Sequence, residues 1–95
     1  MIEMMLLGVL TVRCVDGVAT VEPDVYEAER NEVLEWHSDI EFSLTFDSEG
    51  NANLGSHKKD DQHVRKLPAA RLRVGKNTYS VQSAHCIGDP VIIVR

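Results

Sequence analysis

The amino-acid sequence predicts a single all-β domain, an antiparallel Greek-key β-sandwich of about seven strands. Three observations lead to this prediction. Short segments of alternating apolar and polar residues recur with turn residues between them, which is typical of sandwiches and barrels. Aromatic residues make up only 5% of the chain, so Val, Leu and Ile must form most of the core, and Val and Ile favour strands. The 95 residues fit one domain, residues 1–95.

The first half of the chain contains five predicted strands. The first ends at Asp16-Gly17, which indicates a hairpin because both central positions of a type I′ turn need a positive φ. The clearest alternation places Phe42, Leu44 and Phe46 on one face, and we expect these side chains to join Trp36 in the core. The expected strands are Leu6–Val15, Val18–Val21, Val25–Glu29, Glu32–His37 and Glu41–Phe46.

The second half begins with a polar segment, residues 48–68, which we interpret as a long loop. Loops of this length without internal structure are uncommon in compact domains. The segment is therefore expected to be a functional loop or to contain a short helical turn. Three further strands are expected at Ala70–Val74, Thr78–Gln82 and Val91–Val94, with a turn at Gly75-Lys76-Asn77.

The apolar segment 4–12 does not read as a targeting or membrane segment. It is too short to span a bilayer, and it follows Glu3 rather than the basic residues of a secretory signal. We therefore expect a cytoplasmic protein without a membrane partner. In that compartment Cys14 and Cys86 are expected to be reduced thiols.

Two stretches of the chain resemble the cupredoxin-like β-sandwich. Residues 16–24, leading to residues 31–36, are similar to that family's strand, proline, hydrophilic turn and following strand that ends in Trp or Phe. Residues 77–81, followed by residues 89–94, are similar to its final hairpin. The resemblance leaves the 48–68 segment unmatched. It implies the Greek-key topology of that family.

An immunoglobulin-like sandwich is the alternative fold. Cys14, Trp36 and Cys86 follow the Cys…Trp…Cys order of immunoglobulin domains. Against it, Trp36 lies 22 residues after Cys14, a longer gap than expected there. The position two residues before Cys86 is Ala84, where the tyrosine corner would require Tyr.

The resemblance implies a scaffold that has lost its copper. Copper-binding cupredoxins use two His, one Cys and a weak axial Met. By the resemblance, the first His falls near Phe42, and the C-terminal ligand loop has His85 directly before Cys86, in reversed order. All three Met residues lie at the N-terminus. We therefore expect no cofactor. If a metal were bound, the candidates would be His57, His63, His85 and Cys86, although no CxxC or HExxH motif occurs.

The sequence predicts a non-enzymatic binding module with no catalytic residue, whose variable surface is formed by the 48–68 loop and the 84–89 loop. Cys86 beside His85 suggests a thiolate activated by an imidazole. However, adjacent residues of a strand point to opposite faces. Two alternatives remain open: a metal-binding or redox protein that uses His85 and Cys86, and a small enzyme with a Cys nucleophile.

The charge distribution bears on the partner. Residues 1–50 hold two basic and twelve acidic residues, whereas residues 51–95 hold eight and three. The two halves could simply pack against each other, or the basic half could face a partner. We expect the binding surface at Lys58, Lys59, Arg65 and Lys66, and the partner to be another protein. Nucleic acid is not expected, because no aromatic residue lies between Phe46 and Tyr79 to stack on bases. The oligomeric state stays open.

Overall fold

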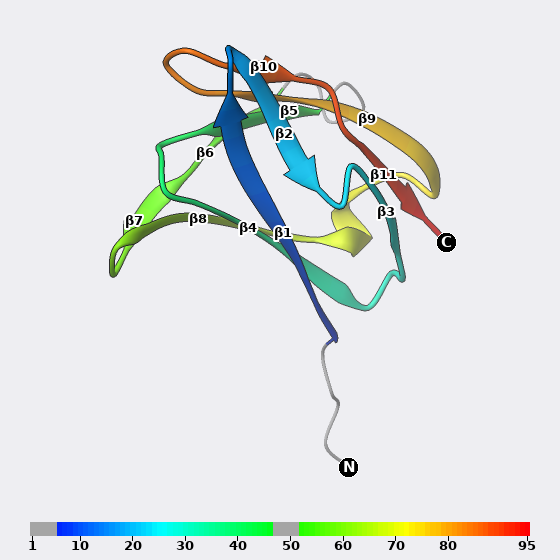
Figure 1. Ribbon diagram of the computed structural model, residues 1–95. Coiled ribbons are helices and arrows are strands. Elements are labelled where there is room, and N and C mark those ends of the chain that lie inside the picture. The colour runs from blue at the N-terminus through cyan, green and yellow to red at the C-terminus, as the bar shows by residue number, and fades with distance from the viewer. Residues whose placement is uncertain (1–5, 47–51) are drawn as a thin grey trace.

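A long N-terminal hairpin organises the structure, a computed structural model that describes residues 6–46 and 52–95 (Figure 1). It consists of β1 (Leu6–Val15) and β2 (Val18–Glu22), which pair antiparallel. At the turn, Asp16 has a φ of 51° and Gly17 a φ of 81°. Both values lie in the left-handed region that a type I′ hairpin requires, so the predicted turn is confirmed.

Strands make up nearly all of the regular structure. The described residues contain eleven of them, together with one 3₁₀ turn, η2 (Ala69–Arg71). None of their helical segments has the length and apolar character needed to cross a membrane. The strands after β2 are β3 (Val25–Ala28), β4 (Glu32–Ser38), β5 (Ser43–Phe46), β6 (Ala52–Gly55), β7 (His57–Lys59), β8 (Gln62–Pro68), β9 (Gly75–Gln82), β10 (Ile87–Gly88) and β11 (Val91–Val94).

Three pairs of consecutive strands are single strands with a short interruption. Pro23-Asp24 separates β2 from β3, Ser56 separates β6 from β7, and Asp89-Pro90 separates β10 from β11. Proline has no backbone N–H to donate, so it ends the ladder at two of the three breaks. After the breaks at Pro23-Asp24 and at Ser56 the strand pairs with different neighbours, whereas β10 and β11 both pair with β9. Counting each pair once leaves eight strand paths among the described residues, close to the predicted number.

The pairing is mixed rather than antiparallel throughout. Three pairs are parallel: β1 with β4, β2 with β10 and β3 with β11. The parallel pairing of β1 and β4 is possible because β2 and β3 form a long crossover connection between them. The structure therefore confirms an all-β, sandwich-like fold, and it differs from the predicted antiparallel sandwich in these three pairings.

The hydrogen-bonded path nearly returns on itself. It runs β9-β10-β2-β1-β4-β8-β7, and β9 also pairs with β5, which pairs with β6. Only Ser56 lies between β6 and β7. The two layers seen in Figure 1 are thus joined along β9 on one side and through Ser56 on the other.

Three aromatic rings fill the centre of the core. Phe46 and Tyr79 stack with ring centroids 4.6 Å apart, and Trp36 meets both edge-on. The Trp36 indole N–H donates to the Tyr79 hydroxyl at 3.1 Å. Phe42, Leu44, Phe46 and Trp36 are each at most 2% exposed, so the predicted core face is confirmed.

The predicted 48–68 loop is wrong over the residues that the structure describes, because β6, β7 and β8 lie within residues 52–68. The segment is polar because most of its side chains are exposed, and its buried apolar residues, Val64 and Leu67, are three apart. That spacing hides the strand period of two. Residues 48–51 lie outside the described part.

Two further predictions near this segment are wrong. Residues 70–74 form part of η2 and an irregular segment instead of a strand. Residues 75–77 are the start of β9 instead of a turn. The buried Asn77 side-chain amide explains the difference, because it donates to the carbonyls of Arg73 and Gly75 and so holds the bend before β9.

Cys14 and Cys86 form a disulfide, so the expectation of reduced thiols is wrong for this structure. Strand pairing brings the two residues together. Cys14 lies opposite Ala19 in the first hairpin. Ile87, which directly follows Cys86, lies beside Val18, the neighbour of Ala19. The resulting Cα–Cα distance is 5.8 Å, a normal separation for a disulfide.

Candidate functional site

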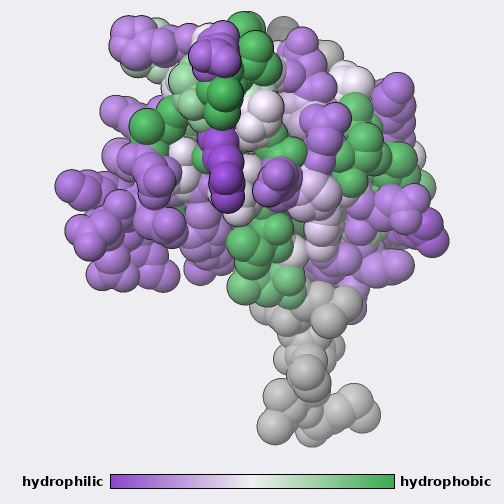
Figure 2. All heavy atoms as spheres, in the orientation of Figure 1, coloured by the Kyte–Doolittle hydropathy of each residue, from purple (hydrophilic) through white to green (hydrophobic). Residues whose placement is uncertain are grey.

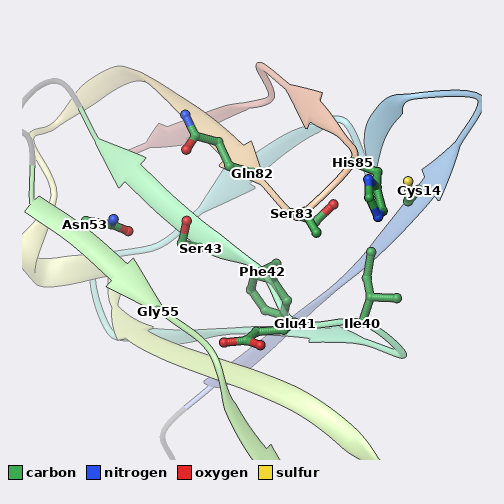
Figure 3. Close-up of a pocket in the computed structure, with 11 residues that line it drawn as sticks. Cys14, Ile40, Glu41, Phe42, Ser43, Asn53, Gly55, Gln82, Ser83 and His85 are labelled. Atoms are coloured by element: carbon green, nitrogen blue, oxygen red, sulfur yellow. The ribbon is translucent and has the colours of Figure 1, made fainter.

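A pocket of about 800 Å³ opens beside the disulfide (Figure 3). It lies between the segment before β5, the edge strand β6 and the turn between β9 and β10. In Figure 3, Asn53, Ser43 and Gln82 project from the strands on one side, while Ser83, His85 and Cys14 lie on the other. The lining residues are Cys14, Ile40, Glu41, Phe42, Ser43, Asn53, Gly55, Gln82, Ser83, Ala84 and His85.

Strand register aligns one wall of the pocket. Ser43 of β5 lies opposite Gly55 of β6 and also opposite Gln82 of β9. These three residues therefore form one row across three strands and face the same way. The row ends where β5 begins, and Ser56 fixes that point: its N–H donates to the Phe42 carbonyl at 2.8 Å, and its hydroxyl accepts from the Phe42 N–H at 3.0 Å.

The opposite wall is the turn 83–86. The Ser83 N–H donates to the Cys86 carbonyl at 2.9 Å, which closes the turn. The disulfide then ties Cys86 to the end of β1. His85 is exposed and lines the pocket, whereas Cys86 is buried. The turn therefore places the imidazole at the pocket and the Cys86 side chain in the core. Both walls are thus held by hydrogen bonds or covalent links.

The lining chemistry is mostly neutral. Ser43, Asn53, Gln82 and Ser83 offer hydroxyl and amide groups, each of which can donate and accept hydrogen bonds. Ile40, Phe42 and Ala84 add apolar surface. Glu41 and His85 are ionisable, and the lining contains no Lys or Arg. The volume is in the range of small-ligand sites, and the lining suits an uncharged polar group with an apolar part.

The four basic residues predicted to bind a partner lie elsewhere, on the β7–β8 hairpin. This hairpin projects from the body in Figure 1. Lys58 lies opposite His63, and Lys59 lies opposite Gln62. Because side chains alternate along strands, Lys58 and Arg65 lie on one face of the hairpin and Lys59 and Lys66 on the other. The structure therefore does not bring the four together as one patch.

Two of the four already have partners within the chain. The Lys66 Nζ lies 3.7 Å from a carboxylate oxygen of Glu35, and the Arg65 guanidinium donates to the Gly55 carbonyl at 3.4 Å. Asp60 and Asp61 follow Lys58 and Lys59 directly at the hairpin turn. The hairpin therefore presents both signs of charge.

A polar cluster on β4 and β8 was not predicted from the sequence. Glu35 Oε1 lies 2.6 Å from His37 Nε2, and His37 Nδ1 lies 3.1 Å from Gln62 Oε1. His37 and Gln62 help to line a second pocket of about 570 Å³ together with Thr11, Arg13 and Asp39. The spacing of Glu35 and His37, two apart in a strand, was the only sequence signal, and it says nothing of Gln62.

The candidate metal ligands are not brought together. His57 shares a hairpin face with Val64, whereas His63 shares the other face with Lys58. His85 lines the first pocket, and the Cys86 sulfur is in the disulfide. Within residues 6–46 and 52–95, no group of three or more His, Cys, Asp or Glu side chains could hold a metal ion.

Comparison with known proteins gives a likeness of fold. No family model and no curated protein matches the sequence. Among solved structures, the chain is similar to the N-terminal domain of phage TP901-1 ORF48, with a TM-score of 0.56 and 8% sequence identity. The match covers 96% of this chain and 99% of that domain. At this identity the likeness shows the all-β fold alone.

Proposed function

We propose that this chain is a small non-enzymatic binding module whose partner is another protein. The pocket beside the disulfide supports this proposal. It joins the two segments that the sequence set apart as variable, since β6 lies within 48–68 and His85 within 84–89. Loops and strand ends on a rigid sandwich commonly carry recognition. We also propose that the scaffold is a cupredoxin-like sandwich without copper, on the stretches that resemble that family.

The pocket chemistry supports an uncharged segment of polypeptide as the bound group. Without Lys or Arg in the lining, an anionic group would find no permanent positive charge. Amide and hydroxyl side chains can instead pair with the N–H and C=O groups of a backbone. Ile40 and Ala84 can receive a small apolar side chain. Phe42 is 2% exposed, so its ring offers little surface for stacking with a ring of a ligand.

Selection of random peptides on the immobilised domain tests this proposal. Peptides that bind in the pocket should be uncharged, and their affinity should change little between low and high salt. Replacing Ser43 and Gln82 by Ala should weaken their binding at least about tenfold, because both hydrogen-bonding groups are removed. Replacing Lys58 and Lys59 by Ser is the matched control and should leave the affinity unchanged.

The opposite pattern would favour the basic hairpin as the binding site. If acidic peptides are selected, and if Lys58→Ser with Lys59→Ser weakens them while the pocket variant does not, the pocket is not the site. The sequence-based expectation of a partner-facing surface at Lys58, Lys59, Arg65 and Lys66 would then hold.

The two alternative functions each need a free Cys86 thiolate. A metal or redox site at His85 and Cys86, or a Cys nucleophile, would require that the disulfide be open. Disulfides persist mainly outside the reducing cytosol. Cytoplasmic localisation, expected from the sequence, stays a prediction. Alkylation of the thiols in intact cells, before lysis, decides it: modified Cys14 and Cys86 indicate the reduced form.

A further inference from the structure

An exposed row of aliphatic side chains crosses the outer face of three neighbouring strands. Val15 of β1 lies opposite Val18 of β2, and Val18 lies beside Ile87 of β10. Their exposed fractions are 55%, 52% and 57%. In Figure 2, apolar side chains gather over the turn between β1 and β2 and over β10, with polar side chains below them. These three large aliphatic side chains thus form a contiguous exposed apolar row.

The next row of the same face carries two opposite charges. Arg13 lies opposite Thr20, two residues before Val15 on β1. Asp89 directly follows β10, and its carboxylate accepts from the Ser80 hydroxyl at 3.2 Å. Ser80 lies two residues before Gln82, the β9 partner of Ile87, so this hydrogen bond holds Asp89 on the face that carries Ile87. Arg13 makes no ion pair with any residue in the described ranges.

We propose that this face binds a second copy of this chain around a two-fold axis that runs along β2. Such an axis exchanges the strands on either side of β2. Val18 then meets Val18 of the second copy, and Val15 meets Ile87. In the row below, Arg13 of each copy lies opposite Asp89 of the other. The face is thus complementary to itself, because apolar residues meet apolar residues and each Arg13 meets an Asp89. A two-fold contact requires such self-complementarity.

The association is weak. Three aliphatic side chains cover far less than the surface of about 800 Å² that each partner buries in a stable complex. We expect a monomer–dimer equilibrium with a Kd on the order of 0.1–1 mM. Sedimentation velocity and light scattering over this concentration range measure it directly.

Charge reversal tests the geometry. Arg13→Asp places two carboxylates opposite each other at both contacts, and Asp89→Arg places two guanidinium groups there. Each variant alone should dimerise at least about tenfold more weakly than the native chain. Mixing the two variants should restore dimers, because every contact then pairs Asp with Arg. This restoration is specific to a contact in which position 13 of one copy meets position 89 of the other.

Substitution on the axis provides a second test with a matched control. Val18→Lys brings two like charges together and should abolish dimers. Val25→Lys alters an equally exposed valine on β3, away from this face, and should leave the equilibrium unchanged. Circular dichroism shows that each variant is folded. A chain that stays monomeric at millimolar concentration overturns the proposal, as do dimers that survive Val18→Lys or single reversals that the mixture does not rescue.

Discussion

At the scale of single residues, Gly88 is where the backbones of two strands come too close for a side chain. A Cβ at this position would clash with the backbone carbonyl of Ala19. The obstacle is backbone, which cannot rotate away as a long side chain can. Gly88 therefore allows β10 to pair with β2, and this pairing also places Cys86 near Cys14.

We predict that Gly88→Ala destabilises the protein by about 1–3 kcal/mol or more, because β10 must move away from β2. Gly55→Ala is the control, since a Cβ there would meet nothing within 4 Å. It should change the free energy of unfolding by at most about 0.5 kcal/mol. Urea titration measures both. Equal effects of the two substitutions would show that the contact between Gly88 and Ala19 is not tight.

The two tyrosines respond to pH in the same direction. Burial, together with the hydrogen bond to Glu32, raises the pKa of Tyr26 from 10.0 to about 12. Burial also raises the pKa of Tyr79, against the smaller opposing effect of the hydrogen bond from Trp36. The chain contains no other tyrosine. The folded state thus favours the protonated form of every phenol.

The raised phenol pKa values make the free energy of unfolding fall at high pH. Unfolded chains lose both phenolic protons near pH 10, while the folded protein keeps them to higher pH. Stability is therefore fully present below pH 10 and falls as the pH rises towards 12. We predict little phenolate absorbance at about pH 10.5 in the folded protein, and clear absorbance in urea. Tyr26→Phe should reduce the loss of stability between pH 10 and pH 12. A folded protein whose tyrosines ionise near pH 10 would contradict this prediction.

At the scale of elements, the sequence predicts best where one face is buried and the other exposed. The first hairpin and β4 are located to within about a residue, because turn residues and alternation coincide. β7 has no buried residue at all, and β8 buries Val64 and Leu67 on opposite faces. β8 is held by its pairing with β4, and β7 by its pairing with β8. A local sequence pattern does not contain the contact between β8 and β4.

The candidate site was predictable only in part, for the same reason. The segments 48–68 and 84–89 were predicted to form the variable surface, and both contribute to the pocket. However, of the residues singled out within them only His85 lines the pocket, and the neutral residues Asn53 and Ala84 were not singled out. Ser43 and Gln82 come from strands that looked purely structural. Their position in the pocket wall depends on the β5–β9 register, which joins distant parts of the chain.

The disulfide between β1 and the turn before β10 is expected to contribute strongly to the stability of the fold. It joins residues 72 apart in the sequence and so restricts the unfolded chain strongly. We predict that Cys14→Ser combined with Cys86→Ser lowers the free energy of unfolding by about 2–5 kcal/mol. Hydrogen exchange should also accelerate in the turn 83–86, which loses its tie to β1.

A thiol assay provides the control for this prediction. Protein purified without reductant and then denatured should show no reactive thiol, and two after reduction, because the chain contains two cysteines. If two thiols react before reduction, or if the double Ser variant is as stable as the native chain, the disulfide does not support the fold.

At the scale of the whole molecule, we predict that the protein binds no stoichiometric copper. Phe42, where the resemblance to cupredoxins would place a His, is 2% exposed and packs in the core. Copper sites of that family also need a Cys thiolate, and the Cys86 sulfur is in the disulfide. Protein prepared with added copper should be colourless, and metal analysis should find far less than one copper per chain. An intense visible band that Cys86→Ser removes would contradict this.

The near-closed strand path also has a consequence for how the domain forms during translation. The N-terminal hairpin leaves the ribosome first, yet one edge of β2 and the neighbour of β3 within residues 6–46 and 52–95 come from residues 87–94. Until those residues have been made, the nascent chain holds apolar strands with open edges, which chaperones and other nascent chains can bind. Because so many contacts join distant positions, folding is expected to be slow for a chain of this size. The domain therefore gains its protection against aggregation late in its synthesis.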